Sequence, residues 1–553
     1  MKLHEAIAKY LVDDAVDTLF GLVGDANLFI LDSFEQYGGR YVSLLHEANA
    51  VVAGLGYASV TGRIGVASVT HGPGLTNTVT ALAEGVRARL PLVLIAGDTP
   101  IADTQHFQDI PQREVVAASG AGFVQARTPE TTLLNLAEAF RRARYESRPI
   151  VLNLPSEFQW AEVEYHPPVS SPTQGRVVPS RDELESAVGI IAAARRPIVL
   201  AGRGALGSRD QVLAFAKRIG APLTTSVRGM DLFHDEPLNM GVFGGVAHDL
   251  ATEVIAGSDC IVSFGAGLNR RTTEDGALLA GRSVVQVDVD SRVLGRYAQV
   301  TVGVHGDAGL AADGLVNLLD VAEVPASSYG SLEMVKRLSR AEEEMAVQKK
   351  RRRRSQGELE ARGERPRDTV DHITAMAALD AGFPRERTLV VDAGLHTLFA
   401  LRLFRATTPE RFVYAVNFGS IGFGVGYSIG AWFGAPQHPV LLVCGDGGLM
   451  LGGLSELQSA VRHKVNLVVG VFNDAAYGAE YVQMLRRGKD PKITTFSWPN
   501  FADVASSLGC DGLEVNSLST LDSVVGELTK GQRERPLLID IRTDAYEVSN
   551  SIT

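Results

Sequence analysis

Cysteine is scarce in this chain. Its 553 residues include only Cys260, Cys444 and Cys510, and no two of them stand in a C-x-x-C arrangement. A disulfide framework or a thiolate metal site would need closely spaced cysteines, so we expect neither. This cysteine usage is typical of a reducing compartment, and we expect the protein to be cytoplasmic.

Long apolar runs and an excess of positive charge are also missing. No segment approaches the roughly 18 uninterrupted apolar residues of a membrane span, and residues 1–21 indicate an amphipathic helix rather than a signal peptide. The 53 basic and 64 acidic side chains give a net charge of -11, without a basic stripe that would suit nucleic acid. We expect a soluble protein with a small-molecule substrate, and neither nucleic acid nor membrane as a partner.

Short apolar runs bounded by Gly, Pro or Asp recur along the chain, separated by segments of helical periodicity such as 210–220 and 454–464. Buried strands that alternate with helices predict an α/β fold with doubly wound parallel sheets, covered on both faces. The runs occupy residues 64–70, 91–97, 148–155, 196–202, 260–267, 283–290, 388–394, 439–448, 466–474 and 536–544.

Two connecting stretches divide the chain into three predicted domains. Residues 166–180 are rich in Pro and Ser, whereas residues from about 325 to 368 are strongly charged and show no strand pattern. The basic run from Lys349 to Arg354 is more typical of a solvated linker than of a docking patch. The predicted domains are 1–165, 180–325 and 369–553, with the charged linker at 326–368.

A Gly-Asp-Gly-Gly motif stands in the run 439–448. Its Asp446 is followed 27 positions later (473 minus 446) by Asn473, at the end of the next run. One β-α-β crossover is about that long, so both side chains should reach the same sheet edge. A carboxylate, an amide oxygen and a backbone carbonyl form a hard oxygen set that suits Mg²⁺. The glycines Gly445, Gly447 and Gly448 would let backbone amides approach a diphosphate, although Gly-Asp-Gly alone also forms ordinary turns.

The pair GDG and ND at this spacing resembles the thiamine diphosphate (ThDP) signature. The resemblance to the acetohydroxyacid synthase, pyruvate oxidase and pyruvate decarboxylase family covers essentially the whole chain. It implies a pyrimidine-binding, a middle and a diphosphate-binding domain, with ThDP and Mg²⁺ as cofactors. It also implies that Asp446, Asn473 and the Ala475 carbonyl hold Mg²⁺, where the family has glycine or a small residue at position 475. Tyr477 and Gly478 are implied to be cofactor-binding.

Two further segments match the same family. Glu47 begins an apolar helix after a short strand at 41–45. In the family, a glutamate there hydrogen-bonds N1′ of the aminopyrimidine and favours the imino tautomer that removes the C2 proton. The alternative is a glutamate that is favoured at a helix N-terminus only by its interaction with the helix dipole. In the segment 417–426, Gly419 and Ile421 match the residues that contact the 4′-amino group and bend the cofactor.

Several polar residues are candidates for the substrate side of the site. Asp25 stands where 2-oxo acid decarboxylases carry an acidic residue after a similar glycine turn. Those enzymes usually have a proline where this chain has Val23. The segment 105–110 resembles the Phe-Gln-Glu stretch of the synthases, with Asp109 in place of Glu and His106 nearby. For each candidate, the alternative is a surface or loop-stabilising role. The histidine in the turn 70–77 is the strongest candidate for a catalytic role. The candidates are Asp25, His71, Gln108 and Glu480.

The middle segment resembles the domain that binds FAD in acetohydroxyacid synthases and pyruvate oxidases. Only Arg271 aligns with the Arg-Phe-Asp-Asp-Arg run of the synthases, so FAD binding and a purely structural domain both stand as alternatives. The family further implies a homodimer or homotetramer with active sites at the subunit interface.

The leading functional expectation is a ThDP-dependent 2-oxo acid decarboxylase or carboligase that resembles acetolactate synthase. The alternative enzyme is an acyloin or diketone lyase or hydrolase that releases no CO₂. An FAD-dependent oxidase and a non-catalytic regulatory paralogue are further alternatives, but a non-catalytic paralogue would usually have lost Glu47 or the metal pair, and both are present.

Overall fold

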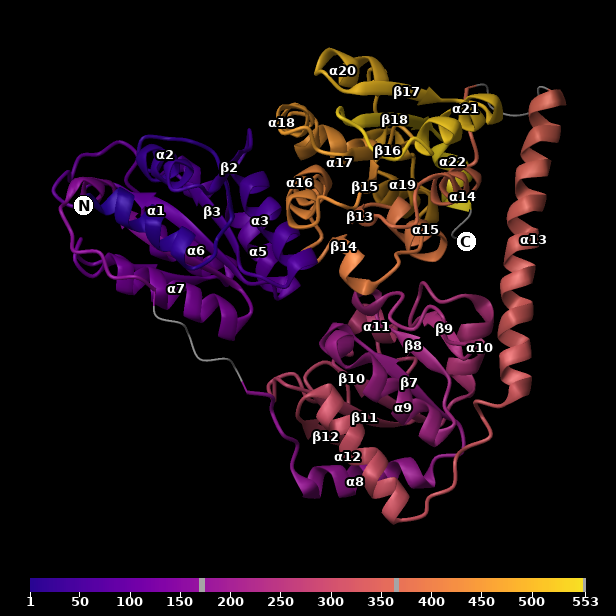
Figure 1. Ribbon diagram of the computed structural model, residues 1–553. Coiled ribbons are helices and arrows are strands. Elements are labelled where there is room, and N and C mark those ends of the chain that lie inside the picture. Colours follow the sequence, from indigo (N-terminus) through magenta and orange to yellow (C-terminus); the bar gives the residue numbers. More distant parts are fainter. Residues whose placement is uncertain (169–174, 363–367, 551–553) are drawn as a thin grey trace. The chain divides into compact units, whose positions relative to one another are not determined.

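The computed structural model describes residues 1–168, 175–362 and 368–550. It contains three six-stranded sheets whose paired strands run parallel, with helices packed around them (Figure 1). This confirms the predicted α/β fold. The undescribed residues 169–174 and 363–367 fall in the two predicted connections, and 551–553 belong to the third predicted domain.

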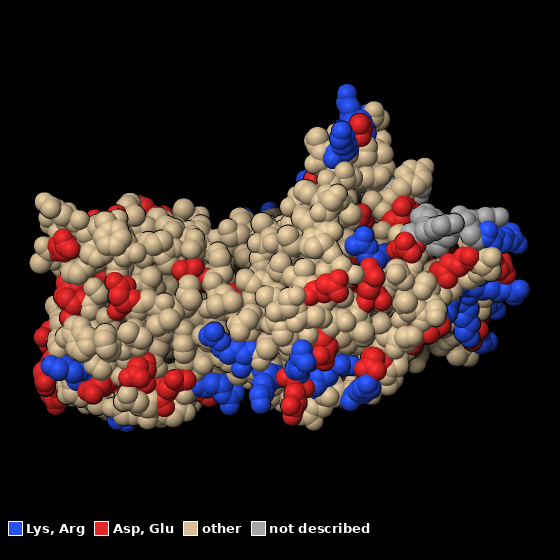
Figure 2. Space-filling model, turned by 90° about the horizontal axis from the view of Figure 1, so that it is seen from above, with Lys and Arg blue, Asp and Glu red and all other residues tan. Residues whose placement is uncertain are grey.

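The chain forms two compact units. Unit 1 combines residues 1–173, 356–400 and 413–553, and unit 2 combines residues 174–355 and 401–412. Unit 1 therefore contains the first predicted domain and the third except for residues 401–412, and we call these two parts its N-terminal and C-terminal halves. Among the described helices, none is long and apolar enough to cross a membrane. On the face drawn in Figure 2, basic side chains lie among acidic ones.

The N-terminal half of unit 1 has a sheet of strand order β2-β1-β3-β4-β6-β5. One expectation needs correction: the helix at the start of the chain ends at Asp13, and the end of the range 1–21 is a strand. The strands are β1 (Thr18–Gly21), β2 (Arg40–Ser43), β3 (Gly65–Val69), β4 (Leu92–Asp98), β5 (Gly122–Gln125) and β6 (Pro149–Pro155). The helices are α1 (Leu3–Asp13), α2 (Leu28–Gln36), α3 (Glu47–Thr61), α4 (Pro73–Thr76), α5 (Val79–Ala88), α6 (Gln112–Ser119), α7 (Thr132–Glu146) and η1 (Ser156–Trp160).

The C-terminal half of unit 1 repeats this topology, with the order β14-β13-β15-β16-β18-β17. Its strands are β13 (Thr388–Asp392), β14 (Phe412–Ala415), β15 (Val440–Gly445), β16 (Leu467–Asn473), β17 (Asp511–Val515) and β18 (Leu537–Arg542). Its helical segments are α14 (His372–Gly382), α15 (His396–Leu403), α16 (Gly424–Gly434), α17 (Asp446–Gly448), η5 (Leu449–Gly453), α18 (Glu456–Arg462), α19 (Gly478–Arg486), η6 (Pro491–Thr494), α20 (Phe501–Ser507), α21 (Leu518–Leu528) and α22 (Ala545–Asn550). The short helix η4 (Pro409–Arg411) lies in the 401–412 segment of unit 2.

Unit 2 holds the middle sheet, of order β12-β11-β10-β7-β8-β9, with an apolar core of its own. The strongly charged segment after it forms the long helix α13, which continues into unit 1. The strands are β7 (Pro197–Ala201), β8 (Leu223–Thr225), β9 (Asn239–Val242), β10 (Cys260–Phe264), β11 (Ser283–Asp288) and β12 (Val302–His305). The helices are α8 (Arg181–Ala193), η2 (Arg203–Ser208), α9 (Arg209–Ile219), η3 (Val227–Gly229), α10 (Asp249–Gly257), α11 (Arg270–Thr273), α12 (Ala308–Val321) and α13 (Leu332–Arg362).

Helices α3 and α16 join the two halves of unit 1. Both are apolar around most of their circumference, as expected for helices buried on all sides. A side chain at Gly56 would overlap the Tyr427 carbonyl, and one at Gly430 would overlap the Ala53 carbonyl. Glycine thus allows the two backbones to touch. Residue pairs from 49 and 426 to 60 and 434 are in contact, so the helices run in the same direction and their first turns lie together.

Candidate functional site

Asp446 and Asn473 come together at the carboxyl edge of the C-terminal sheet. Asp446 directly follows β15 and Asn473 ends β16, and in the parallel register Gly445 lies opposite Phe472. Both side chains are buried, with 2% and 1% exposure. The spacing argument made from the sequence therefore gives the correct placement of this pair.

Each of these two side chains is held by a partner that the sequence motifs did not reveal. The indole Nε1 of Trp498 donates a hydrogen bond to Asp446 Oδ2 at 2.9 Å, and Gly447 N donates to Oδ1 at 2.8 Å. Asn473 Nδ2 donates to the fully buried Asp540 Oδ1 at 2.8 Å. Because an ionised carboxylate only accepts hydrogen bonds, this contact fixes the amide so that its Oδ1 points away from Asp540.

The buried carboxyls at this edge would benefit from a bound cation. Burial raises the pKa of Asp446, and burial together with the charge of Asp446 raises the pKa of the adjacent Asp474. Two neighbouring carboxyls that resist ionisation lose that penalty when a divalent ion lies between or beside them. No group of three His, Cys, Asp or Glu side chains in the described part of the chain has metal-site geometry, so a metal here would depend on amide and carbonyl oxygens as well.

Ala475 supplies the third predicted oxygen. Its φ of +54° is left-handed, the conformation that glycine adopts most easily, which accounts for the small residue expected at this position. The Ala475 carbonyl accepts a hydrogen bond from Phe496 N at 2.8 Å. A carbonyl oxygen has two lone pairs, so one remains for a metal.

The Gly445–Gly448 turn has no room for side chains. A Cβ at Gly447 would overlap the ring of Tyr477, and one at Gly445 would lie 3.1 Å from His396 Nδ1. His396 is 7% exposed, and burial lowers its pKa to about 4, so its ring is neutral at physiological pH. This bare backbone beside a hard oxygen set fits the diphosphate and metal of ThDP.

The segment 417–426 lies next to this turn. Gly419 has a φ of +89°, and Gly422 N donates a hydrogen bond to Asp392 Oδ2 at 3.1 Å. Burial raises the pKa of Asp392 to about 7. Ile421 is half-buried beside this contact. Asp392 thus fixes the segment that carries the predicted Gly419 and Ile421 contacts.

Glu47 is the first residue of α3 and is half-buried. Asn77 Nδ2 donates a hydrogen bond to Glu47 Oε2 at 2.9 Å. Two residues further, Asn49 Nδ2 donates to the carbonyl of Gly452 in the C-terminal half, at 2.9 Å. The α3–α16 contact therefore places the first turn of α3, which Glu47 begins, against the first turn of α16. The prediction that such contacts cross a subunit interface stays a prediction, since here the two halves belong to one chain.

His71 lies in a second polar cluster of the N-terminal half. It is 1% exposed; its Nδ1 lies 3.9 Å from Asp25 Oδ1, and its Nε2 has no hydrogen-bond partner among the described residues. The ring of His106 meets it edge-on at a centroid distance of 5.0 Å. A Cβ at Gly72 would lie 2.6 Å from the Gln108 carbonyl, so the 105–110 loop packs directly on the histidine turn.

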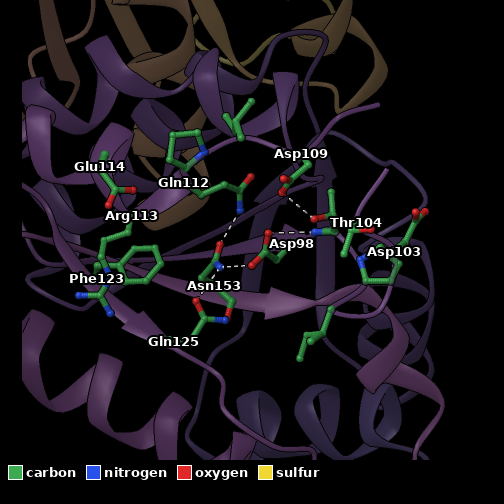
Figure 3. A pocket seen from close by; sticks show the side chains of 15 residues that line it. Asp98, Asp103, Thr104, Asp109, Gln112, Arg113, Glu114, Phe123, Gln125 and Asn153 are labelled. Atoms are coloured by element: carbon green, nitrogen blue, oxygen red, sulfur yellow. Dashed lines mark hydrogen bonds between the residues drawn. The ribbon is translucent and has the colours of Figure 1, made fainter. Parts of the chain in front are cut away.

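A polar pocket of about 500 Å³ lies beside this loop, at the carboxyl edge of β4 and β6 (Figure 3). Gln112 links its wall to the histidine turn: Gly72 N donates to Gln112 Oε1, and Gln112 Nε2 donates to Asn153 Oδ1. Asn153 in turn donates to Asp98. Asp109 lines this pocket and accepts a hydrogen bond from Thr99 Oγ1. The network connects the loop of the candidate residues to the sheet.

Of the remaining predicted residues, Glu480 and Arg271 are exposed, whereas Gly478 lies beside Asp474. Glu480 is exposed on α19, and no contact given for the described residues joins it to Glu47 or His71. Gly478 begins the same helix, where a Cβ would lie 3.2 Å from Asp474 Oδ2. Arg271 is exposed on α11 of unit 2, so FAD binding stays a prediction.

Family models match all three domains. The N-terminal TPP binding domain of thiamine pyrophosphate enzymes matches residues 1–119, the central domain matches 184–315, and the C-terminal TPP binding domain matches 392–541. The chain belongs to the thiamine pyrophosphate enzyme family. Thiamine pyrophosphate is another name for ThDP, and the matched segments include Glu47, Asp446 and Asn473.

Curated relatives cover nearly the full chain at low identity. A sulfoacetaldehyde acetyltransferase of Castellaniella defragrans is 28% identical over 541 residues, which is 94% of this chain and 89% of that protein. A probable 2-ketoarginine decarboxylase of Pseudomonas aeruginosa is 28% identical over 530 residues, covering 94% and 90%. The acetolactate synthase isozyme 2 large subunit of Escherichia coli is 24% identical over 542 residues, covering 96% and 94%.

The Trp498–Asp446 hydrogen bond gives a first prediction. Trp498→Phe removes the indole donor but keeps an aromatic ring stacked on Phe496. We expect Mg²⁺ affinity in the presence of ThDP to fall about tenfold, the lower end of the effect of losing a partner that orients a metal ligand. Titration calorimetry measures it. Trp432→Phe is the matched control, because Trp432 Nε1 has no partner among the described residues; equal affinities of the two variants would contradict the role of Trp498.

Proposed function

We propose that this chain is a ThDP- and Mg²⁺-dependent enzyme that cleaves or forms a C–C bond next to the carbonyl of a 2-oxo acid, as a decarboxylase or carboligase. The observation that carries the proposal is the meeting, within unit 1, of the first turn of α3, which Glu47 begins, with Gly426 and Gly452, which lie next to the Asp446 and Asn473 edge. The relatives named a decarboxylase, an acetyltransferase and an acetolactate synthase support the reaction class without selecting one reaction.

The proposed role of each residue follows from its contacts. When bound, ThDP supplies a nucleophilic carbon and an electron sink for the C–C bond change. Asp446, Asn473 and the Ala475 carbonyl would hold Mg²⁺, and the Gly445–Gly448 backbone would hold the diphosphate. Glu47 would share a proton with N1′ through Oε1, because Asn77 already donates to Oε2. His71 would exchange a proton with the substrate through Nε2, the buried nitrogen that has no described partner.

A panel of 2-oxo acids, aldehydes and 1,2-diketones, incubated with ThDP and Mg²⁺, tests this proposal. CO₂ and carbon products are measured together by NMR and gas analysis, with Glu47→Gln as the inactive control. Release of CO₂ from a 2-oxo acid, with an aldehyde or a coupled hydroxyketone as product, is the expected result. Turnover of diketones alone, without CO₂, would overturn it.

The diketone or acyloin lyase is the second candidate. The observation that favours it is the His71–His106 pair beside Asp25, because three proton-exchanging groups in contact can activate a water as the acceptor. An oxidase would require FAD, which absorbs near ~450 nm. A colourless purified protein that is active with ThDP and Mg²⁺ alone would remove that alternative.

We further propose a homodimer or homotetramer, as in the family that the chain resembles. If each complete site needs two subunits, specific activity should fall on dilution towards the dissociation constant of the oligomer. Sedimentation during turnover measures the species that is active. An active monomer at full specific activity would contradict this arrangement.

A further inference from the structure

Two fully buried glutamates lie outside all of the motifs that indicated the site. Glu84 is on α5 in the N-terminal half of unit 1, and Glu456 is the first residue of α18 in the C-terminal half; both are 0% exposed. Within the described ranges, no ion pair is given for either carboxylate. A buried carboxyl without a cation depends on hydrogen bonds, and each of these finds them in the other half of the unit.

Glu84 binds the segment that precedes α16. Its Oε1 accepts hydrogen bonds from Asn417 N at 3.0 Å, Asn417 Nδ2 at 2.7 Å and the Tyr427 hydroxyl at 3.2 Å. Its Oε2 accepts from Phe418 N at 2.5 Å. The next residue is Gly419. A Cβ added at this glycine would have no neighbouring atom within 4 Å. The segment therefore has little packing of its own there, and Glu84 is its anchor.

Glu456 binds the segment that precedes α3. Leu45 N donates to both of its oxygens, at 3.0 and 3.2 Å, and Asn49 Nδ2 donates to Oε1 at 3.3 Å. Within its own half, Ser459 Oγ donates to Oε2 at 2.6 Å. Leu45 and Asn49 stand on either side of Glu47, so the carboxylate of Glu456 holds the turn that presents Glu47.

The two contacts are equivalent by topology. The two sheets of unit 1 have the same strand order, in which β3 corresponds to β15 and α3 to α16. Glu84 is on a helix that follows β3, and Glu456 is on the helix that follows β15. Each glutamate reaches across the α3–α16 contact and accepts hydrogen bonds from backbone N–H groups in the segment that precedes the opposite helix: Asn417 and Phe418 for Glu84, and Leu45 for Glu456.

We propose that Glu84 and Glu456 are reciprocal positioning residues, each of which fixes the cofactor-facing segment of the opposite half. Glu84 holds Gly419 and Ile421 in place, and Glu456 holds Glu47. The inference rests on the proposed function for its catalytic consequence. Its structural consequence can be measured on the cofactor-free protein.

The test uses Glu84→Gln and Glu456→Gln in the full chain. A glutamine places an NH₂ group where one carboxylate oxygen accepted. In Glu84→Gln, at least one N–H donor of the opposite segment therefore loses its partner, and in Glu456→Gln, Leu45 N keeps only one of its two acceptor oxygens. In the cofactor-free protein, we expect amide exchange in 412–423 to rise roughly tenfold or more in Glu84→Gln, and in 43–50 by a similar factor in Glu456→Gln. Each variant should leave the other segment and the strand β15 at the parent rate.

Kinetics provide the second readout. Since neither variant touches Asp446 or Asn473, Mg²⁺-dependent ThDP retention should stay within a fewfold of the parent, while kcat falls roughly tenfold or more. Glu84→Asp keeps both acceptor oxygens and should recover part of the loss. Glu35→Gln, a change at an exposed glutamate on α2, is the control and should change neither readout.

Three outcomes overturn the proposal. Parent exchange rates in both segments would remove the anchoring role, and a rise that includes β15 would show general destabilisation instead. Local exchange changes with unaltered kcat would show that the contacts are structural only.

If a glutamine variant does not fold, Asn417→Ala and Tyr427→Phe remove single donors to Glu84 and should raise exchange in 412–423 alone. Failure of the proposed function is a separate result, because the parent protein would then show no ThDP-dependent turnover.

Discussion

Asp446→Ala is expected to abolish the retention of Mg²⁺ and ThDP rather than only to slow turnover. Asp446 is the only side chain of the proposed metal set that carries a charge, and it lies on the glycine turn that would hold the diphosphate. Without it, the negative diphosphate would face an uncharged amide, one backbone carbonyl and the half-buried carboxyl of Asp474. We expect calorimetry to detect no ThDP binding at concentrations that saturate the parent protein.

Two controls separate this loss from unfolding. The change leaves the indole N–H of Trp498 without its acceptor, which costs about 1–3 kcal/mol of stability, so thermal melting must accompany the titration. Asp446→Asn keeps the shape and one acceptor and should fold normally, yet still lose most of the metal affinity. Asp511→Ala removes a partly exposed carboxylate from the amino end of β17 and should retain ThDP. Unchanged affinity in Asp446→Ala would contradict the metal assignment.

Most of the inner strands of the three sheets were predictable from the sequence, although β1 and β8 were not. All ten apolar runs coincide with strands, because a parallel strand covered on both faces must be apolar along its whole length. The strands without such a run include the edge strands β5, β9, β12 and β17, whose residues alternate between buried and half-exposed or are mostly half-exposed. An edge strand has one neighbour and an open side, so it leaves only a weak pattern in the sequence.

The site was predictable where motif residues directly follow strands, and not where distant segments support them. Asp446 and Asn473 could be paired from spacing alone, whereas Trp498 reaches Asp446 from 52 positions away. In the sequence, Asp540 and Asp392 could be noticed only because each is an aspartate that follows several apolar residues within a predicted strand. A charged residue retained in a buried strand needs a specific partner, and here the partners are Asn473 and Gly422. Glu84 and Glu456 could not be found this way, because their partners belong to the other half of the unit.

Glu47→Gln is expected to separate cofactor binding from chemistry. Asn77 Nδ2 donates to Glu47 Oε2, so the amide oxygen of the glutamine must face Asn77 to keep that hydrogen bond. In the proposed site, its NH₂ group would then face N1′ of the aminopyrimidine. An amide in this position can donate a hydrogen bond, but it cannot give up and retake a proton. The variant should therefore fold, and should bind ThDP and Mg²⁺ through the intact Asp446 and Asn473 edge.

The chemistry should fail by a large factor in the same variant. C2 proton exchange of the bound cofactor and turnover should fall together by about 10² or more, the usual scale for losing an acid–base group. If Glu47 were only a carboxylate at the positive end of α3, the change would cost at most about 1 kcal/mol of stability and leave the exchange rate intact. Quenched NMR of deuterium exchange at C2 decides between the two, with Glu35→Gln, at an exposed glutamate on α2, as the control. Exchange at the parent rate would remove Glu47 from the mechanism, while a loss of exchange with retained ThDP affinity would assign proton transfer to the N-terminal half and cofactor retention to the C-terminal half.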